Sequence, residues 1–200
     1  MPLNWTKTAE GDTEVADLIS SDGRPVEVLQ VLLEWEQPGR TGFLGRFKPT
    51  TDIDVSAIIF CGSEDVDYVS PKEHPRALSG AVIHHGDVVA GQGEGGGERI
   101  TMKLAELRAD DDDITAIALT ASCAKGGFNK IAGAVCRIYD MQPVGPAHLG
   151  NVRFSVSENH TGALLGVVKK TDTGWTFTKT KQYGPGGDWR TLAHLARGHV

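Results

Sequence analysis

The apolar residues of this chain recur in short runs with a period of two, separated by turn-forming residues. Between Arg99 and Leu104, and again from Asn151 to Ser157, apolar and polar side chains alternate, as in a strand with one buried face. Gly, Pro, Asn and Asp stand between the runs, where they favour turns. Residues 163–168 and 175–178 flank the turn residues Thr171–Gly174 and predict a hairpin. The pattern indicates a protein built mainly of strands.

Helical signals are confined to two short stretches. Leu104–Arg108 predicts a single helical turn. Asp188–Arg197 predicts a short terminal helix, because Asp188 suits an N-cap and Gly198 stands just past the end. About nine strands and little helix predict an all-β fold, a β-sandwich of two mainly antiparallel sheets with a short C-terminal helix.

The 200 residues suffice for one substantial core. We expect a polar N-terminal segment over 1–25 and a single domain over 26–200. No apolar stretch marks a signal peptide in the first 12 residues, and no run of 18 apolar residues occurs, so we expect a cytoplasmic location. Three widely spaced cysteines, Cys61, Cys123 and Cys136, are expected to be reduced and mostly buried.

Charge and motifs exclude several functions. A net charge of −6 argues against nonspecific nucleic-acid binding. The motifs of serine hydrolases and zinc proteases do not occur, and no small-molecule substrate is evident, so we expect no enzymatic activity. Gln37–Thr51 is predicted to be a basic loop. A further group of basic residues is either a solvated strand face or a patch for an anionic partner or membrane surface: Lys169, Lys170, Lys179 and Lys181.

Residues 86–98 form the most glycine-rich segment, with six of the chain's 25 glycines. Gly91, Gly93 and Gly96 have the spacing of a dinucleotide-binding loop, but an alternating strand follows where that loop requires a helix. The charged residues of the segment are all acidic. An acidic, glycine-rich loop suits calcium, which takes many oxygen ligands from a tightly wrapped chain.

A second source of carboxylates precedes this loop in the sequence. Asp52, Asp54 and Ser56 would share one face of a strand, with successive side chains roughly 6.6 Å apart. Both aspartates can therefore approach one ion at the end of the strand. The candidate metal ligands are Asp52, Asp54, Asp87, Glu94 and Glu98.

Each candidate also has a structural interpretation. The two aspartates of the strand can be the solvent-facing half of an edge strand, Asp87 can cap a turn, and the two glutamates can keep a loop soluble. His84 and His85 are adjacent on a strand and face opposite ways, so we expect structural roles for them rather than metal binding.

Several segments resemble the TerD family of tellurium-resistance and stress proteins. Asp52–Ala57 resembles the family's D-L-D-x-S-A strand, and His84–Glu98 resembles its H-x-G-D signature with a glycine-rich acidic loop. Val135–Ile138, the hairpin through Phe177 and the segment Gly187–Gly198 match later parts of the family pattern in order. The resemblance runs from about Val26 to the end of the chain.

The resemblance implies a β-sandwich with a calcium-binding end, no catalysis, and a role in resistance to tellurite and other stresses. It also implies partners among other stress-response proteins, in cytosolic assemblies near the inner membrane.

Departures from the family pattern bear on calcium. Val88 and Ala90 replace the pattern's Asn and Thr, and Gly96 and Gly97 stand where the pattern carries acids. Calcium affinity depends on ligand charge and number, so we expect one weakened site. The alternative is a metal-free scaffold that acts as a protein-interaction module.

Overall fold

The computed structural model describes most of the chain. The described residues are 2–8, 13–36, 52–87, 96–109, 112–124, 126–131, 133–142, 144–154 and 159–200. The predicted loop Gln37–Thr51 lies outside these ranges, as does Glu94.

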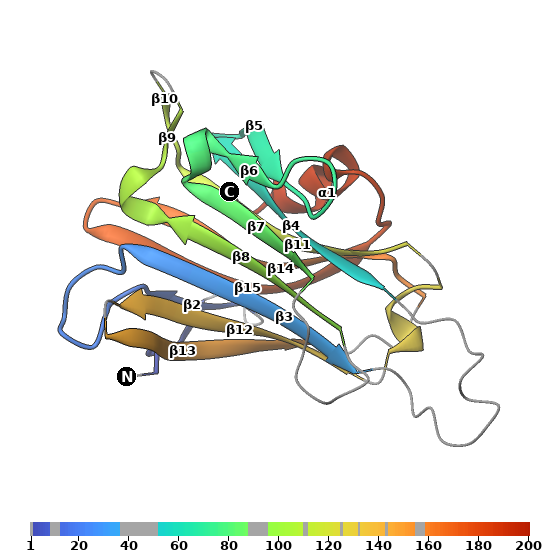
Figure 1. Ribbon diagram of the computed structural model, residues 1–200, viewed down its shortest axis with the longest axis horizontal. Coiled ribbons are helices and arrows are strands. Elements are labelled where there is room, and N and C mark those ends of the chain that lie inside the picture. The colour runs from blue at the N-terminus through green and yellow to red at the C-terminus, as the bar shows by residue number, and fades with distance from the viewer. Residues whose placement is uncertain are drawn as a thin grey trace.

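Two antiparallel sheets form the molecule, which confirms the predicted β-sandwich (Figure 1). The seven-stranded sheet has, in spatial order, β1 (Thr6–Lys7), β2 (Glu14–Asp17), β15 (Gly174–Gly184), β14 (Gly162–Thr171), β11 (Ala116–Cys123), β4 (Ile53–Cys61) and β5 (Glu64–Val69). The six-stranded sheet has β13 (Gly145–Phe154), β12 (Gly133–Gln142), β3 (Val28–Glu36), β8 (Gly96–Lys103), β7 (Val82–Asp87) and β6 (Arg76–Ala77). A separate pair joins β9 (Arg108–Ala109) to β10 (Asp112–Asp113).

Helices are short and few in the described part of the chain. The α-helix α1 spans Trp189–Ala196, and the Asp188 carboxylate accepts the Thr191 N–H at 3.0 Å, which confirms the predicted N-cap. Single 3₁₀ turns are η2 (Leu78–Gly80), η3 (Leu104–Glu106) and η4 (Phe128–Lys130), and η3 confirms the turn predicted after the strand that ends at Lys103. None of the described helices is long and apolar enough to cross a bilayer.

The main core lies between the two sheets and follows the alternation of the sequence. On β3 every second side chain from Leu29 to Trp35 is buried, and the residues between them are half-buried. β4 is buried on both faces because α1 covers the outer face of its sheet (Figure 1). Ile58 and Phe60 pack there against Leu192 and its neighbours in the helix. This double burial explains why the β4 sequence changes from alternating to wholly apolar.

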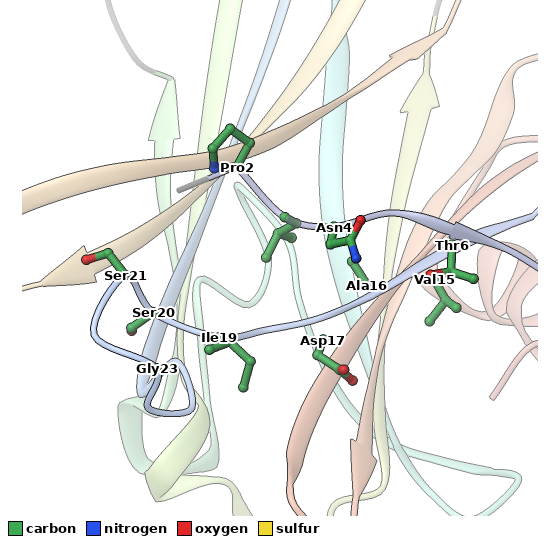
Figure 2. Close-up of a pocket in the computed structure, with 11 residues that line it drawn as sticks. Pro2, Asn4, Thr6, Val15, Ala16, Asp17, Ile19, Ser20, Ser21 and Gly23 are labelled. Atoms are coloured by element: carbon green, nitrogen blue, oxygen red, sulfur yellow. The ribbon is translucent and has the colours of Figure 1, made fainter.

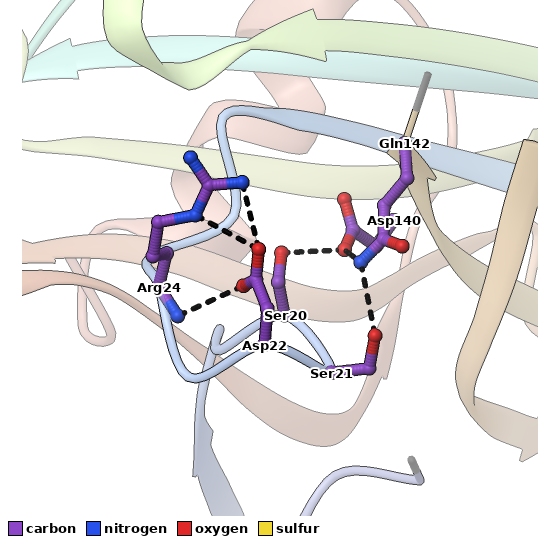
Figure 3. A network of polar contacts seen from close by, with 6 residues as sticks. All are labelled: Ser20, Ser21, Asp22, Arg24, Asp140 and Gln142. Carbon is purple, nitrogen blue, oxygen red and sulfur yellow. Dashed lines mark hydrogen bonds and ion pairs between the residues drawn. The ribbon is translucent and has the colours of Figure 1, made fainter. Parts of the chain in front are cut away.

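A buried carboxylate, Asp140, ties the turn before β3 to the end of β12 (Figure 3). Ser20 Oγ donates to its Oδ2 at 2.6 Å, and Gln142 Nε2 donates to the same oxygen at 2.7 Å. On the exposed side of the turn, Arg24 forms an ion pair with Asp22 at 2.7 Å. The network satisfies an acid that is only 3 % exposed, as burial of a charge requires.

The strands are more numerous than predicted from the sequence. β13 begins at Gly145, although Pro146 follows immediately, because β13 is an edge strand where proline removes no ladder bond. β5, with the acidic sequence EDVDYV, is the edge of the other sheet. β1 and β2 come from the first 25 residues and extend that sheet beside β15.

Candidate metal site at one end of the sandwich

The strands β4, β7 and β8 bring some of the predicted ligands to one end of the sandwich. Asp87, the last residue of β7, lies opposite Glu98 in β8. Glu98 in turn reaches the backbone of β4, where its Oε2 accepts the Val55 N–H at 2.5 Å. Glu98 is therefore the neighbour of both β4 and Asp87 at this end of the sandwich.

Glu98 is not a loop residue but part of the core. Its side chain is 1 % exposed and faces inward in step with Ile100 and Met102 of the same strand. The expectation of a solvated loop acid at this position is therefore wrong. Pairing between β4 and β5 covers Ala57 to Cys61 and does not reach Val55. The Val55 N–H therefore has no partner in β5, and the Glu98 carboxylate accepts it instead.

His84 is the second buried partner of Glu98. Its Nε2 lies 3.4 Å from Glu98 Oε2, and its side chain is fully buried. The Gly86 N–H donates to His84 Nδ1 at 2.9 Å, so the proton of the neutral ring is assigned to Nε2, which faces the carboxylate. Among the described residues, this nitrogen has no hydrogen bond of ordinary geometry.

A bulge in β7 produces this arrangement. The register between β7 and β8 shifts between His84 and Asp87, and Gly86 has a φ of +71°. The extra residue turns the Gly86 N–H back toward the imidazole. His85 remains exposed, which confirms that the two histidines face opposite ways.

The surroundings of Glu98 oppose its ionisation. Burial raises the pKa of this carboxyl, while the nearby His84 ring and the hydrogen bond from the Val55 N–H act against the rise. The negative charge of Asp54 raises the pKa further. A carboxyl in these surroundings holds its proton more tightly than an exposed glutamate does.

Asp54 lies on the opposite face of β4 from the core. Its side chain is 22 % exposed, and its Oδ1 is 3.8 Å from Lys72 Nζ. It lines a hollow of about 300 Å³ beside the start of α1, together with Ser56, which confirms that these two residues share a face. Tyr68 and Trp189 stack at the wall of this hollow with ring centroids 4.7 Å apart.

The remaining predicted ligands lie apart or outside the described residues. Asp52 is exposed just before β4. The backbone of Asp87 is described, but its side chain is not, and Glu94 lies wholly outside the described ranges. Among the described residues, no three His, Cys, Asp or Glu side chains form a group that could hold a metal ion.

Gly96 and Gly97 are strand residues, at two positions where the family pattern has acidic residues. They open β8 and pair with Trp35 and Glu34 of β3. The described acids thus do not by themselves fit a calcium site: Glu98 is engaged inside the core, and Asp54 faces the helix side.

The cysteines provide no reactive thiol at this site. None of the three cysteines is in a disulfide, Cys123 and Cys136 are buried, and Cys61 is half-buried. Burial raises the pKa of Cys136 to about 12, which keeps it a thiol at neutral pH.

Comparison with known proteins agrees with this architecture. The TerD domain profile matches residues 16–198. The tellurium resistance protein TerZ of Serratia marcescens is 24 % identical over 187 residues, covering 91 % of this chain and 87 % of that protein. A homologue of telluride resistance protein from Streptomyces coelicolor has the same fold, with a TM-score of 0.61 and 16 % identity, and the match covers 84 % of this chain and 95 % of that one.

A second crystal structure, of a protein of unknown function called SAV2460, also shares the fold, with a TM-score of 0.61 and 17 % identity. The match covers 88 % of this chain and 99 % of that one. Likeness at these identities establishes the fold, whereas the profile match over nearly the whole chain establishes the family. The chain belongs to the TerD domain family of tellurium-resistance proteins.

Proposed function

We propose that the protein is a non-enzymatic stress-response protein of the tellurium-resistance type that acts as a binding scaffold. We further propose that Glu98 serves its fold rather than a metal ion. The observation that carries this proposal is the engagement of Glu98 inside the core, where it joins β4 of one sheet to β8 of the other. A ligand of a readily exchanging metal would instead face an accessible cavity.

The chemistry of the described residues supports a role in binding. The buried polar pair of the site, His84 and Glu98, is not among the lining residues of the four hollows that are formed by described residues. The buried thiol of Cys136 is held in its unreactive form. Both features favour a protein that acts through its surface, within the family to which TerZ belongs.

Tellurite tolerance tests the functional class. A tellurite-sensitive bacterial strain that expresses the protein is expected to grow at higher tellurite concentrations than the strain with empty vector. Asp54→Asn is expected to retain this gain, because the scaffold does not depend on that carboxylate. Equal growth with and without the folded protein would contradict the assignment to this class.

A weakened calcium site is the second candidate function. It is supported by Glu98, which lies opposite Asp87 of β7 and accepts a hydrogen bond from Val55, the residue after Asp54 in β4. Carboxylate oxygens are the ligands that calcium prefers. Asp52 and Glu94 would complete this set.

Thermal unfolding with calcium separates the two candidates. Under the scaffold proposal, millimolar calcium is expected to change the melting temperature by less than about 1 °C, because no binding is linked to folding. A calcium-dependent rise in melting temperature would establish the calcium site instead, provided that Asp54→Asn abolishes the rise and Asp17→Asn preserves it. Asp17 is the matched control, because it is an exposed aspartate on β2.

A further inference from the structure

A groove with strongly basic walls lies where the edges of the two sheets face each other. Lys7 of β1 and Lys179 and Lys181 of β15 come from the seven-stranded sheet, while Arg153 comes from β13, the edge of the other sheet. The groove has a volume of about 330 Å³, within the range of small-molecule sites. It shares no lining residue with the candidate metal site, and it does not rest on the function proposed above.

The charge of this groove opposes that of the whole chain. The chain carries a net charge of −6, yet four cationic side chains line the groove and Glu14 is its one described acid. The hydrogen bond from Lys179 lowers the pKa of Glu14, and the charges of Lys7 and Lys181 lower it further. Three lysines therefore act together on one carboxylate.

One of the four cations is held in place by the fold. Lys179 Nζ lies 2.9 Å from Glu14 Oε2 and 3.5 Å from the centre of the Trp5 ring. Trp5 is itself fixed, because its ring meets Phe177 edge to face at 6.0 Å. Lys179 thus presents an ordered ammonium group at the wall of the groove.

The other three cations have exposed side chains and no ion pair within the described part of the chain. These residues are Lys7, Arg153 and Lys181. Like charges gathered in this way repel one another, and an anion seated between them relieves that repulsion. An arginine also offers paired N–H donors that match the oxygens of a phosphate.

We propose that this groove binds a small ligand that carries phosphate groups, with Arg153 and Lys181 as its principal contacts. Three cations that form no ion pair with any described residue call for two or more negative charges on a compact group. A pyrophosphate or a phosphomonoester has that charge at neutral pH, whereas a single carboxylate does not. The overall negative charge of the protein disfavours an extended nucleic acid in the same place.

A neighbouring hollow shows how specific this charge pattern is. A cavity of about 470 Å³ lies beside β1 and β2, and Figure 2 shows Asn4 and Asp17 among its lining residues. Asp17 is the one charged residue among the described residues that line it. The basic groups are therefore gathered in one of the two hollows at this side of the sandwich.

Calorimetric titration with pyrophosphate tests the proposal on the full chain. Saturable binding is expected, and Arg153→Gln/Lys181→Gln is expected to weaken it by about tenfold or more, because each substitution removes a charge-assisted hydrogen bond. Glu14→Gln is expected to tighten binding by about twofold or more, since it removes the one acid that competes with the ligand. The control pair Arg76→Gln/Lys169→Gln removes the same charge elsewhere and is expected to leave the affinity within about twofold.

A second arm distinguishes a free phosphate from a lipid headgroup. Flotation with phosphatidylcholine vesicles, with and without phosphatidic acid, measures binding to a membrane-borne phosphate. Binding to pyrophosphate alone, or to phosphatidic acid alone, supports the site and identifies its source of phosphate, provided that the groove variant loses it. Binding to neither probe, or equal loss in the groove and control variants at unchanged melting temperature, would overturn the proposal.

Discussion

Glu98→Ala is expected to lower the free energy of unfolding by about 3 kcal/mol, because it leaves the buried Val55 N–H without an acceptor and removes the carboxylate beside the buried His84 ring. Glu98 accepts the Val55 N–H at 2.5 Å, and its Oε2 lies 3.4 Å from His84 Nε2. The substitution also empties space between the sheets, which adds a cavity cost. Urea unfolding followed by tryptophan fluorescence measures the change.

Glu98→Gln separates the hydrogen bond from the charge. The amide oxygen of the glutamine still accepts the Val55 N–H. Unlike the carboxyl of Glu98, however, the amide does not ionise when the pH rises. Since burial raises the pKa of Glu98, the folded state binds this proton more tightly than the unfolded state. The contribution of Glu98 to stability therefore falls as the pH rises from the ordinary value near 4.5 through the raised pKa. Over that pH range, the free energy of unfolding of the wild type is expected to fall relative to that of the Glu98→Gln variant.

Glu64→Ala is the matched control for the alanine variant, because Glu64 is an exposed acid at the start of β5. It is expected to change the free energy of unfolding by less than about 0.5 kcal/mol. If Glu98→Ala proved equally harmless, or if wild type and Glu98→Gln had parallel pH profiles, the structural role assigned to Glu98 would be wrong.

Much of the fold could be predicted from local sequence patterns. The alternation over residues 99–104 predicted the core part of β8, and turn residues Thr171–Gly174 placed the β14–β15 hairpin. Asp188 and Gly198 bracketed α1 within about a residue. These elements were predictable because their neighbours in sequence determine them.

β5 and the first part of β13, before Asn151, were missed because their stability comes from tertiary pairing. β5 is rich in acids and β13 contains Pro146, so neither has strong strand propensity. Each is held by a long neighbouring strand, β4 and β12 respectively, whose sequence is apolar. Local propensity does not contain this information.

At the candidate site, local sequence patterns do not indicate how the side chains point. Asp87 and Glu98 lie in register between β7 and β8. The burial of Glu98 had a signal in the sequence, since it keeps step with Ile100 and Met102, the apolar face of the same strand. The role of His84 depends on the bulge at Gly86, which no periodicity reveals.

The second large effect is expected at Gly186, which lies against the backbone before β14. An added Cβ there would lie 2.5 Å from the carbonyl carbon of Thr161 and closer still to its oxygen. Backbone atoms cannot rotate away as a side chain can, so the chain itself has to move. Gly186→Ala is therefore expected to cost about 3 kcal/mol of unfolding free energy, which urea titration measures.

Gly133 is the matched control, because an added Cβ at that position meets nothing within 4 Å. Gly133→Ala is expected to be neutral or to stabilise by about 0.5 kcal/mol through the unfolded state. The displacement at Gly186 should also reach α1, since Asp188 and Trp189 follow directly in the sequence. The Trp189–Tyr68 stack, at 4.7 Å, then loosens and tryptophan fluorescence of the folded state changes. A Gly186→Ala variant with wild-type stability and an unchanged folded spectrum would show that the segment after β15 yields freely, and that close backbone packing does not fix α1 on the sheet.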